Sequence, residues 1–318
     1  MTVVQQVDSP RTLMRWRRRD GIAFEASDHT LVSAADLRRG GGRAVYYAVL
    51  TFAVIAVALV FLFPLYWMIS SALKTPAELV RPHPTIVPHS FHPNAYSSAW
   101  SMLRLPHYLL NTAYYAFGGW LIQLVVDTAL AYALSKLRPA GGKIVLGLVL
   151  ATLMLPGTAL LIPLYVTVVD VPLVHLHLLN SPWALWLPGA ANAFNVYVLK
   201  RFFDQIPDDL LDAAKIDGAG RLRTLWSIVL PLSKPVLAVV SIIAIIGIWK
   251  DFLWPLIVLQ DPNVQTVNVA LQNLQATSHV PQNVFYAGLV IASAPMIAFF
   301  LVFQRYILGG LQAGALKG

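Results

Sequence analysis

Residues 208–235, DDLLDAAKIDGAGRLRTLWSIVLPLSKP, form a polar and charged island between long apolar runs. Pro207 stands where a first helical turn can begin, because its fixed φ suits that position. Asp208 and Asp209 follow and place carboxylates near the positive end of the helix dipole. The stretch therefore predicts a helix that starts here and runs to about Ile216.

A turn and a second helix are expected next. Gly218 tolerates the left-handed conformation that ends many helices. Beyond it, apolar residues recur at spacing i, i+3, i+4, i+7, which is typical of one helix face, and we expect Pro231 to end this second helix. The face consists of Leu222, Leu225, Trp226 and Val229. We expect a helix-turn-helix elbow (residues 208–235) with an exposed apolar stripe that needs a partner.

The composition indicates a membrane protein. The chain has 318 residues, a mean hydropathy of +0.64 and only 12% charged residues. These values are too apolar for a soluble domain, and several apolar runs are long enough to cross about 30 Å of hydrocarbon. Cysteine is absent, which excludes disulfides and thiolate metal sites.

Six membrane spans are expected, which makes the fold class an all-α integral membrane protein with the elbow between spans four and five. The expected spans are residues 44–69, 109–134, 144–168, 183–199, 236–258 and 284–308. The proline-rich segment between the first two should be extended, with short interfacial helices at most. Prolines 156 and 163, and Pro188-Gly189, should break spans three and four around a cavity, because freed backbone groups need a protein or water partner.

The basic residues predict the orientation. With the amino terminus inside, nineteen Lys and Arg residues lie on the cytoplasmic side, against Lys74, Arg81 and Arg104 outside. This distribution places both termini and the elbow in the cytoplasm. It also explains the net charge of +8 as a topology signal, and nucleic acid is not an expected partner.

The elbow resembles the EAA loop of bacterial ABC importer permeases of the carbohydrate (maltose and multiple-sugar) type. The matching residues are Asp212-Ala213-Ala214, Asp217-Gly218-Ala219, Ile228, Leu230-Pro231 and Pro235. The sequence departs from the family pattern at Asp212, where Glu is usual, and at Leu225, where an aromatic residue is common. Trp226 next to it could supply the aromatic ring.

The resemblance implies a permease subunit in a bacterial inner membrane that works by alternating access. It implies a second homologous permease, two ATPase subunits that carry ATP and magnesium, an extracytoplasmic solute-binding protein and a sugar substrate, in a lipid bilayer. This chain would bind no cofactor and catalyse no reaction. The loop at about residues 204–235 would dock on an ATPase through Asp212, Ala213, Ala214, Asp217, Gly218, Ala219, Leu222, Leu225, Trp226 and Pro231.

The resemblance covers residues 44–318, the transmembrane domain. The basic tail, residues 1–43, is left unexplained, although its arginines suit anionic headgroups or an orientation signal. The last residues, 309–318, resemble the tail that reaches between the ATPase subunits in the maltose type. By composition alone they would be a flexible end.

Polar residues inside the spans are candidates for the translocation path. Trp249, Lys250 and Asp251 form one group, in which Lys250 could instead extend toward the outer interface while Asp251 pairs locally. Asn192 and Asn195 form another, for which hydrogen bonding between helices is the commoner explanation. The substrate itself is not predicted by any of them.

ATP chemistry is not expected in this chain. The nearest string to a P-loop, Gly141-Gly142-Lys143-Ile144, lacks both the leading spacing and the hydroxyl that holds magnesium. No catalytic or metal-binding spacing is apparent either. An ion-coupled secondary transporter is the alternative, with Asp127 or Asp251 as coupling carboxylates, but it would call for inverted repeats.

Overall fold

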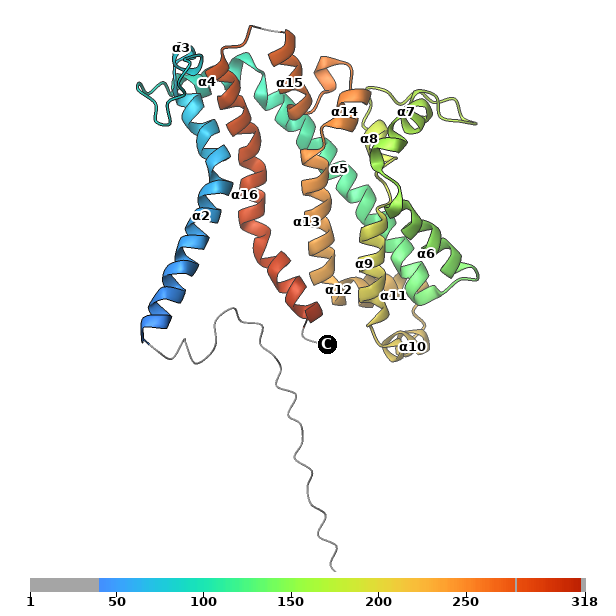
Figure 1. Ribbon diagram of the computed structural model, residues 1–318. Helices are drawn as coiled ribbons and strands as arrows, with labels where there is room; N and C mark the ends of the chain where they lie inside the picture. Colours follow the sequence, from blue (N-terminus) through green and yellow to red (C-terminus); the bar gives the residue numbers. More distant parts are fainter. Residues whose placement is uncertain (1–39, 278, 316–318) are drawn as a thin grey trace, which may run out of the picture. The chain divides into compact units, whose positions relative to one another are not determined.

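The computed structural model describes residues 40–277 and 279–315, which fold into helices, turns and one isolated bridge between Val171 and Leu176 (Figure 1). The chain divides into two compact units after Phe61. The described part of the first unit is the beginning of one helix, α2. All other elements lie in the second unit, so the basic tail lies almost wholly outside the described residues.

The helices follow one another along the chain with few long connections. In order they are α2 (Gly40–Leu73), α3 (Pro76–Leu79), α4 (Asn94–Met102), α5 (Leu105–Tyr132), α6 (Gly142–Ala151), α7 (Leu161–Val169), α8 (Trp183–Trp186), α9 (Ala193–Asp204), α10 (Asp208–Ile216), α11 (Arg221–Thr224), α12 (Leu230–Leu232), α13 (Lys234–Lys250), α14 (Leu253–Val258), α15 (Val267–Thr277) and α16 (Gln282–Ala315). π-Helical turns extend α5 over Ala133–Leu137 and join α11 to α12 over Leu225–Val229.

Three helices are long and apolar enough to cross a bilayer, and two bent pairs meet the same criterion together. The three are Arg43–Leu73, Leu105–Leu137 and Gln282–Tyr306. The first pair, Gly142–Met154 with Gly157–Val169, bends by 102° at Pro156. The second, Arg221–Leu232 with Lys234–Lys250, bends by 84°. Five of the six expected spans therefore have a counterpart.

The fourth expected span is the exception. Only the four residues of α8 and the twelve of α9 are helical there, separated by the irregular segment that holds Pro188-Gly189. The break is where we expected it, but the two pieces are too short to count as one membrane helix. The six-span count is therefore not confirmed.

Three further helix ends differ from expectation. Gly40, Gly41 and Gly42 start α2 rather than closing a loose tail, and α16 continues through Gly309-Gly310 to Ala315. Pro231 lies in the first turn of α12, where proline is tolerated, and the chain bends after Leu232 instead. The connection before α5 agrees with expectation, because it holds only the short helices α3 and α4.

Helix α5 is the central element of the second unit. It packs against α9 and α13, and α13 packs in turn against α16 (Figure 1). One buried cluster lies near the start of α5, where it meets α4, α15 and α16. Another lies at its other end and joins α9, the elbow and α13. The elbow is therefore attached to the core of the helices that would cross the membrane.

Gly118 of α5 permits the close approach of α8. A Cβ atom at this position would lie 2.3 Å from Cζ2 of Trp186, which is buried. We expect Gly118→Ala to lower the stability of the chain by about 1–3 kcal/mol through overpacking. Thermal unfolding in detergent measures this.

Gly147→Ala is the matched control, because a Cβ atom at Gly147 of α6 meets nothing within 4 Å. Alanine is the better helix former, so this variant should be neutral or slightly stabilising. Equal unfolding temperatures for the two variants would contradict the packing argument.

Candidate functional site

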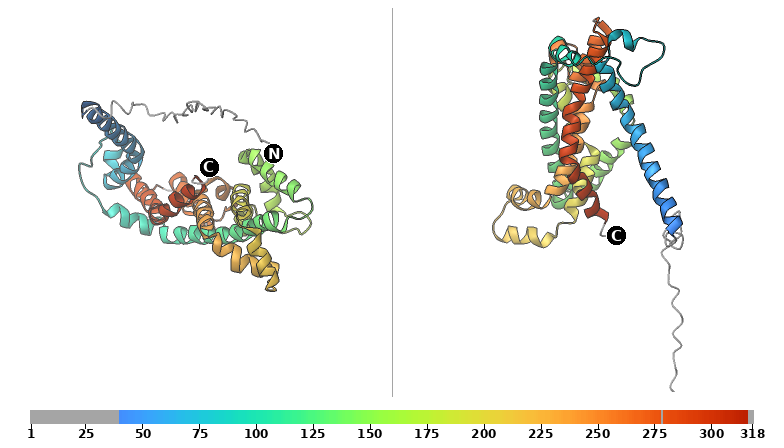
Figure 2. Two further views of the ribbon diagram at one scale, coloured as in Figure 1. Left: turned by 90° about the horizontal axis from the view of Figure 1, so that it is seen from below. Right: turned by 90° about the vertical axis from the view of Figure 1, so that its left-hand side faces the viewer.

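The elbow has the geometry of a stiff two-armed lever. Helix α10 ends at Ile216, Asp217 is its C-cap, and Gly218 follows with φ +76° in the left-handed region. The amide of Ala219 donates to the carbonyl of Ala214 at 2.8 Å, which closes the helix end as glycine termini commonly do. The second arm, Arg221–Leu232, lies at 84° to α13. Figure 2 shows the elbow projecting from one end of the helices of the second unit.

Basic side chains at the end of α5 anchor the first arm. Lys136 is buried, and its Nζ donates to the carbonyl of Ile206 at 2.6 Å and to Oδ1 of Asp208 at 2.8 Å. Arg138 reaches the other oxygen of Asp208 at 3.0 Å. In addition, the Tyr132 hydroxyl donates to the carbonyl of Arg221 at 3.1 Å. Movement of the elbow is therefore coupled to α5 through charge and hydrogen bonds.

The apolar stripe of the second arm is divided, which corrects our expectation of one exposed face. Leu225 and Val229 are buried in the core with α9 and α13, whereas Leu222 and Trp226 remain 73% and 69% exposed. The π-turn over Leu225–Val229 changes the angular spacing of the side chains, so an i, i+3, i+4, i+7 pattern no longer marks one face. Leu225 is thus a core residue of the elbow.

The remaining elbow candidates lie mostly on its surface. Asp212, Ala213 and Asp217 are exposed, and Asp212 pairs with Lys215 at 2.8 Å. Ala214 is buried and Ala219 is half-buried. The second arm begins after Gly220 with no side-chain cap, so neither aspartate caps it. The exposed apolar side chains nearest the corner are Ile216, Leu222 and Trp226.

The anchor should depend on pH. The hydrogen bond and charge of Lys136, with Arg138 beside it, hold the pKa of Asp208 below its usual value. A depressed carboxyl pKa stabilises the folded state above the unfolded value of about 3.9, and this stabilisation is lost as the pH falls through the folded pKa. We expect Asp208→Asn to lower the unfolding temperature at pH 5–7 and to make no difference at a pH well below 4.

Asp209→Asn is the control for this measurement, since Asp209 forms no ion pair within the described part of the chain. It should lower the unfolding temperature much less than Asp208→Asn does, because it removes only the interaction of one carboxylate with the helix dipole. A difference between wild type and Asp208→Asn that persists at low pH would rule out the ionic anchor.

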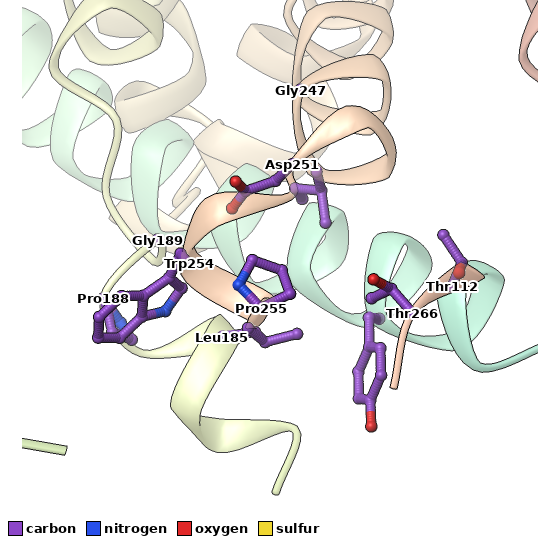
Figure 3. Close-up of a pocket in the computed structure, with 11 residues that line it drawn as sticks. Thr112, Leu185, Pro188, Gly189, Gly247, Asp251, Trp254, Pro255 and Thr266 are labelled. Carbon is purple, nitrogen blue, oxygen red and sulfur yellow. The ribbon is translucent and has the colours of Figure 1, made fainter. Parts of the chain in front are cut away.

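A second feature is a cavity of about 260 Å³ in the second unit (Figure 3). Its wall combines α5, the break between α8 and α9, the end of α13, and α14. The lining residues are Thr112, Tyr115, Leu185, Pro188, Gly189, Gly247, Ile248, Asp251, Trp254, Pro255 and Thr266. It is the kind of cavity that the helix-breaking residues led us to expect.

Hydrogen bonds hold the cavity wall in shape. Nε1 of Trp254 donates to the carbonyl of Ala184 at 3.0 Å, and the Tyr115 hydroxyl donates to that of Val264 at 2.8 Å. The Thr112 hydroxyl accepts from the amide of Val267 at 2.9 Å. Aromatic faces beside a carboxylate and hydroxyl groups provide both stacking and hydrogen bonding, which suits a polyhydroxylated solute.

The intramembrane candidates divide between this cavity and other places. Asp251 lines the cavity and forms no ion pair with any residue described, so it does not pair with Lys250. Lys250 is exposed, and neither Lys250 nor Trp249 lines the cavity. The carbonyl of Trp249 accepts from Nδ2 of Asn268 at 3.1 Å. Helix α13 ends at Lys250, and the backbone turns there.

Asn192 and Asn195 lie apart from the cavity wall. The Asn192 side chain caps α9, because its Oδ1 accepts from the backbone amide of Asn195 at 3.1 Å. The backbone amide of Asn192 donates to Oδ1 of Asp127 on α5 at 2.8 Å. Asn195 is buried. This arrangement fixes the start of α9 against α5, as in the helix-bonding alternative.

Four of the lining residues, Thr112, Tyr115, Trp254 and Thr266, were not predicted from the sequence. Trp254 lies in the aromatic run beside Asp251, which was an available signal. No sequence signal marked the threonines or Tyr115, because single polar residues in apolar segments are common. Only the folded chain brings them to one cavity.

The comparisons with known proteins agree with this geometry. Residues 128–311 match the family model described as "Binding-protein-dependent transport system inner membrane component". The sulfoquinovosyl glycerol transport system permease protein SmoH of Agrobacterium fabrum is 34% identical, covering 81% of this chain and 89% of its own. The melibiose/raffinose/stachyose import permease protein MelC of Bacillus subtilis is 30% identical, covering 85% and 96%.

A solved structure has the same fold. A chain of a bacterial ABC transporter that imports the acidic polysaccharide alginate aligns with a TM-score of 0.73. The alignment covers 87% of this chain and 99% of that one at 24% identity. At this identity the likeness establishes the fold.

Proposed function

Because the chain belongs to the family of binding-protein-dependent transport system inner membrane components, we propose that it forms one half of the translocation path of a carbohydrate importer. Members of this family are multi-pass inner-membrane permeases that work with a solute-binding protein, and they are not themselves enzymes. The match runs from the last residues of α5 into α16, and it includes the whole elbow and all the lining residues of the cavity except Thr112 and Tyr115. Membership does not favour an ion-coupled carrier.

The energy source in this proposal is a pair of ATPase subunits docked on the elbow, with ATP and magnesium bound there and not on this chain. The single observation that carries it is the elbow corner: a left-handed Gly218 between two arms, with Ile216, Leu222 and Trp226 exposed around it. Large apolar side chains on a polar surface mark a protein contact. The elbow would lie in the cytoplasm, with both termini on the same side.

The mechanism is alternating access. When the ATPase subunits close on ATP, each carries its elbow with it. The ion pairs of Asp208 and the buried side chains of Leu225 and Val229 transmit the movement to α5, α9 and α13. Helices α5 and α13 also contribute to the cavity wall, so the cavity opens to one side of the membrane at a time. A second permease completes the path.

Carbohydrate as the substrate class rests on the relatives, which include import proteins for oligosaccharides and for a sulfosugar glycoside. The cavity agrees with this class, because Trp254, Tyr115 and Asp251 line it together. Asp251 accepts hydrogen bonds from hydroxyl groups, and the rings offer apolar faces to the sugar.

Purification from native membranes in mild detergent tests the proposal. We expect the chain to co-purify with a second permease and a P-loop ATPase, and ATPase activity to rise when a sugar-loaded binding protein is added. Recovery of the chain alone, with solute uptake that follows a proton gradient and not ATP, would overturn it.

A further inference from the structure

A second cavity, separate from the path described above, lies between the end of α5, the start of α6, and α9. Its volume is about 430 Å³. The lining residues are Leu134, Ser135, Arg138, Pro139, Gly142, Lys143, Leu146, Lys200 and Asp204. We propose that this cavity binds the headgroup of an anionic phospholipid.

Charge is the first argument. Lys200 pairs with Asp204 at 2.8 Å, and the Ser135 hydroxyl donates to the same carboxylate at 2.7 Å, so that acidic group is satisfied. Arg138 shares Asp208 with Lys136. Lys143 has no acidic partner within the described residues. The cavity lining therefore holds three cations, Arg138, Lys143 and Lys200, and one carboxylate, Asp204, and this surplus of positive charge favours a phosphate group.

The backbone around Arg138 is the second argument. Arg138 follows a π-turn and has φ +46°, in the left-handed region that residues other than glycine seldom occupy. Its Nε donates to the carbonyl of Ser135 at 3.0 Å, which keeps the side chain folded back on the cavity rim. π-Turns and residues in rare conformations are concentrated at functional sites.

The apolar surroundings distinguish a lipid from a free anion. Leu134, Pro139 and Leu146 form one wall of the cavity. Ile144 and Leu148 of α6, which are 69% and 66% exposed, lie on the opposite face of the helix from Leu146 and do not extend this wall. A headgroup bound at the basic rim could lay the start of its acyl chains against Leu134, Pro139 and Leu146. Basic pockets between membrane helices bind anionic headgroups in this way.

The test uses the purified, delipidated transporter and native mass spectrometry with phosphatidylglycerol, cardiolipin or phosphatidylcholine. We expect the wild type to retain the two anionic lipids and not phosphatidylcholine, and inorganic phosphate not to displace them. Lys143→Gln should weaken retention about fivefold, the effect of one basic residue near an anionic headgroup. Lys143→Arg should restore it.

Lys234→Gln is the control, because Lys234 is an exposed cation at the start of α13 and does not line the cavity. If Lys234→Gln lost as much anionic lipid as Lys143→Gln, the effect would be one of surface charge alone, and the site would be overturned. Retention of phosphatidylcholine equal to that of the anionic lipids would also overturn it. Displacement by inorganic phosphate would make it a free-anion site. Retention by the isolated full chain but not by the assembled transporter would mean that a partner's acidic segment occupies the cavity. None of these outcomes depends on the substrate or on transport.

Discussion

Replacing Gly218 by valine is expected to abolish ATP-driven uptake while the chain still inserts and assembles. The reason is conformational, because φ is +76° at this position and a Cβ atom would meet nothing within 4 Å. A β-branched residue is strongly disfavoured in the left-handed region. The corner would open, and the two arms would no longer present Ile216 and Leu222 to one partner. Uptake in reconstituted vesicles measures the effect.

Two further variants separate the effect of the left-handed backbone at residue 218 from the effect of the added side-chain volume. Gly220 lies two residues away with an ordinary φ of −71° and equally open space, so Gly220→Val should retain most of the uptake. Gly218→Asn should restore a large part of it, since asparagine tolerates the left-handed conformation. Normal transport by Gly218→Val would contradict the lever mechanism.

Replacing Asp251 by asparagine is expected to lower uptake about tenfold or more. The variant keeps the shape of the side chain but removes the charge of the only acidic residue in the wall of the cavity as the structure describes it. A hydrogen bond to a charged group contributes about 1.5–3 kcal/mol, which corresponds to roughly tenfold to a hundredfold in affinity. We expect KM for the sugar-loaded binding protein to change little, because Asp251 acts on the sugar after its release.

Lys250→Gln is the matched control next to it in the sequence. Lys250 is exposed outside the cavity, so uptake should be unchanged. If Lys250→Gln lowered uptake and Asp251→Asn did not, the cavity would not be the path. If Asp251→Asn lost thermal stability in step with its loss of uptake, Asp251 would have a structural role, which would also count against the assignment.

The elbow was largely predictable because its signals are local. Pro207, the two aspartates after it and Gly218 act through the backbone of their own helix turn, and α10 and its left-handed end follow from them. The family membership followed from the same stretch and is confirmed by the family model. The docking of the elbow on an ATPase stays a prediction.

The stripe of the second arm was not predictable in detail. A regular helix would have placed Leu222, Leu225, Trp226 and Val229 on one face, but a π-turn turns Leu225 and Val229 into the core. In the folded chain these two side chains pack against α9 and α13. Their burial therefore depends on residues of other helices and not on the local pattern.

The sequence by itself determined that this is a membrane protein, that its fold is all-α, and that the elbow turns at Gly218. The hydropathy of each span, the basic residues that border it and a single glycine each act over one helix or less. They therefore do not depend on how the rest of the chain packs. Only the tertiary structure decided which polar residues meet. It brought Asp251 and Trp254 to a cavity with Thr112, left Lys250 outside, and joined Lys136 and Arg138 to Asp208 across some seventy residues. Contacts between distant segments form only when helices pack, and no local pattern encodes them.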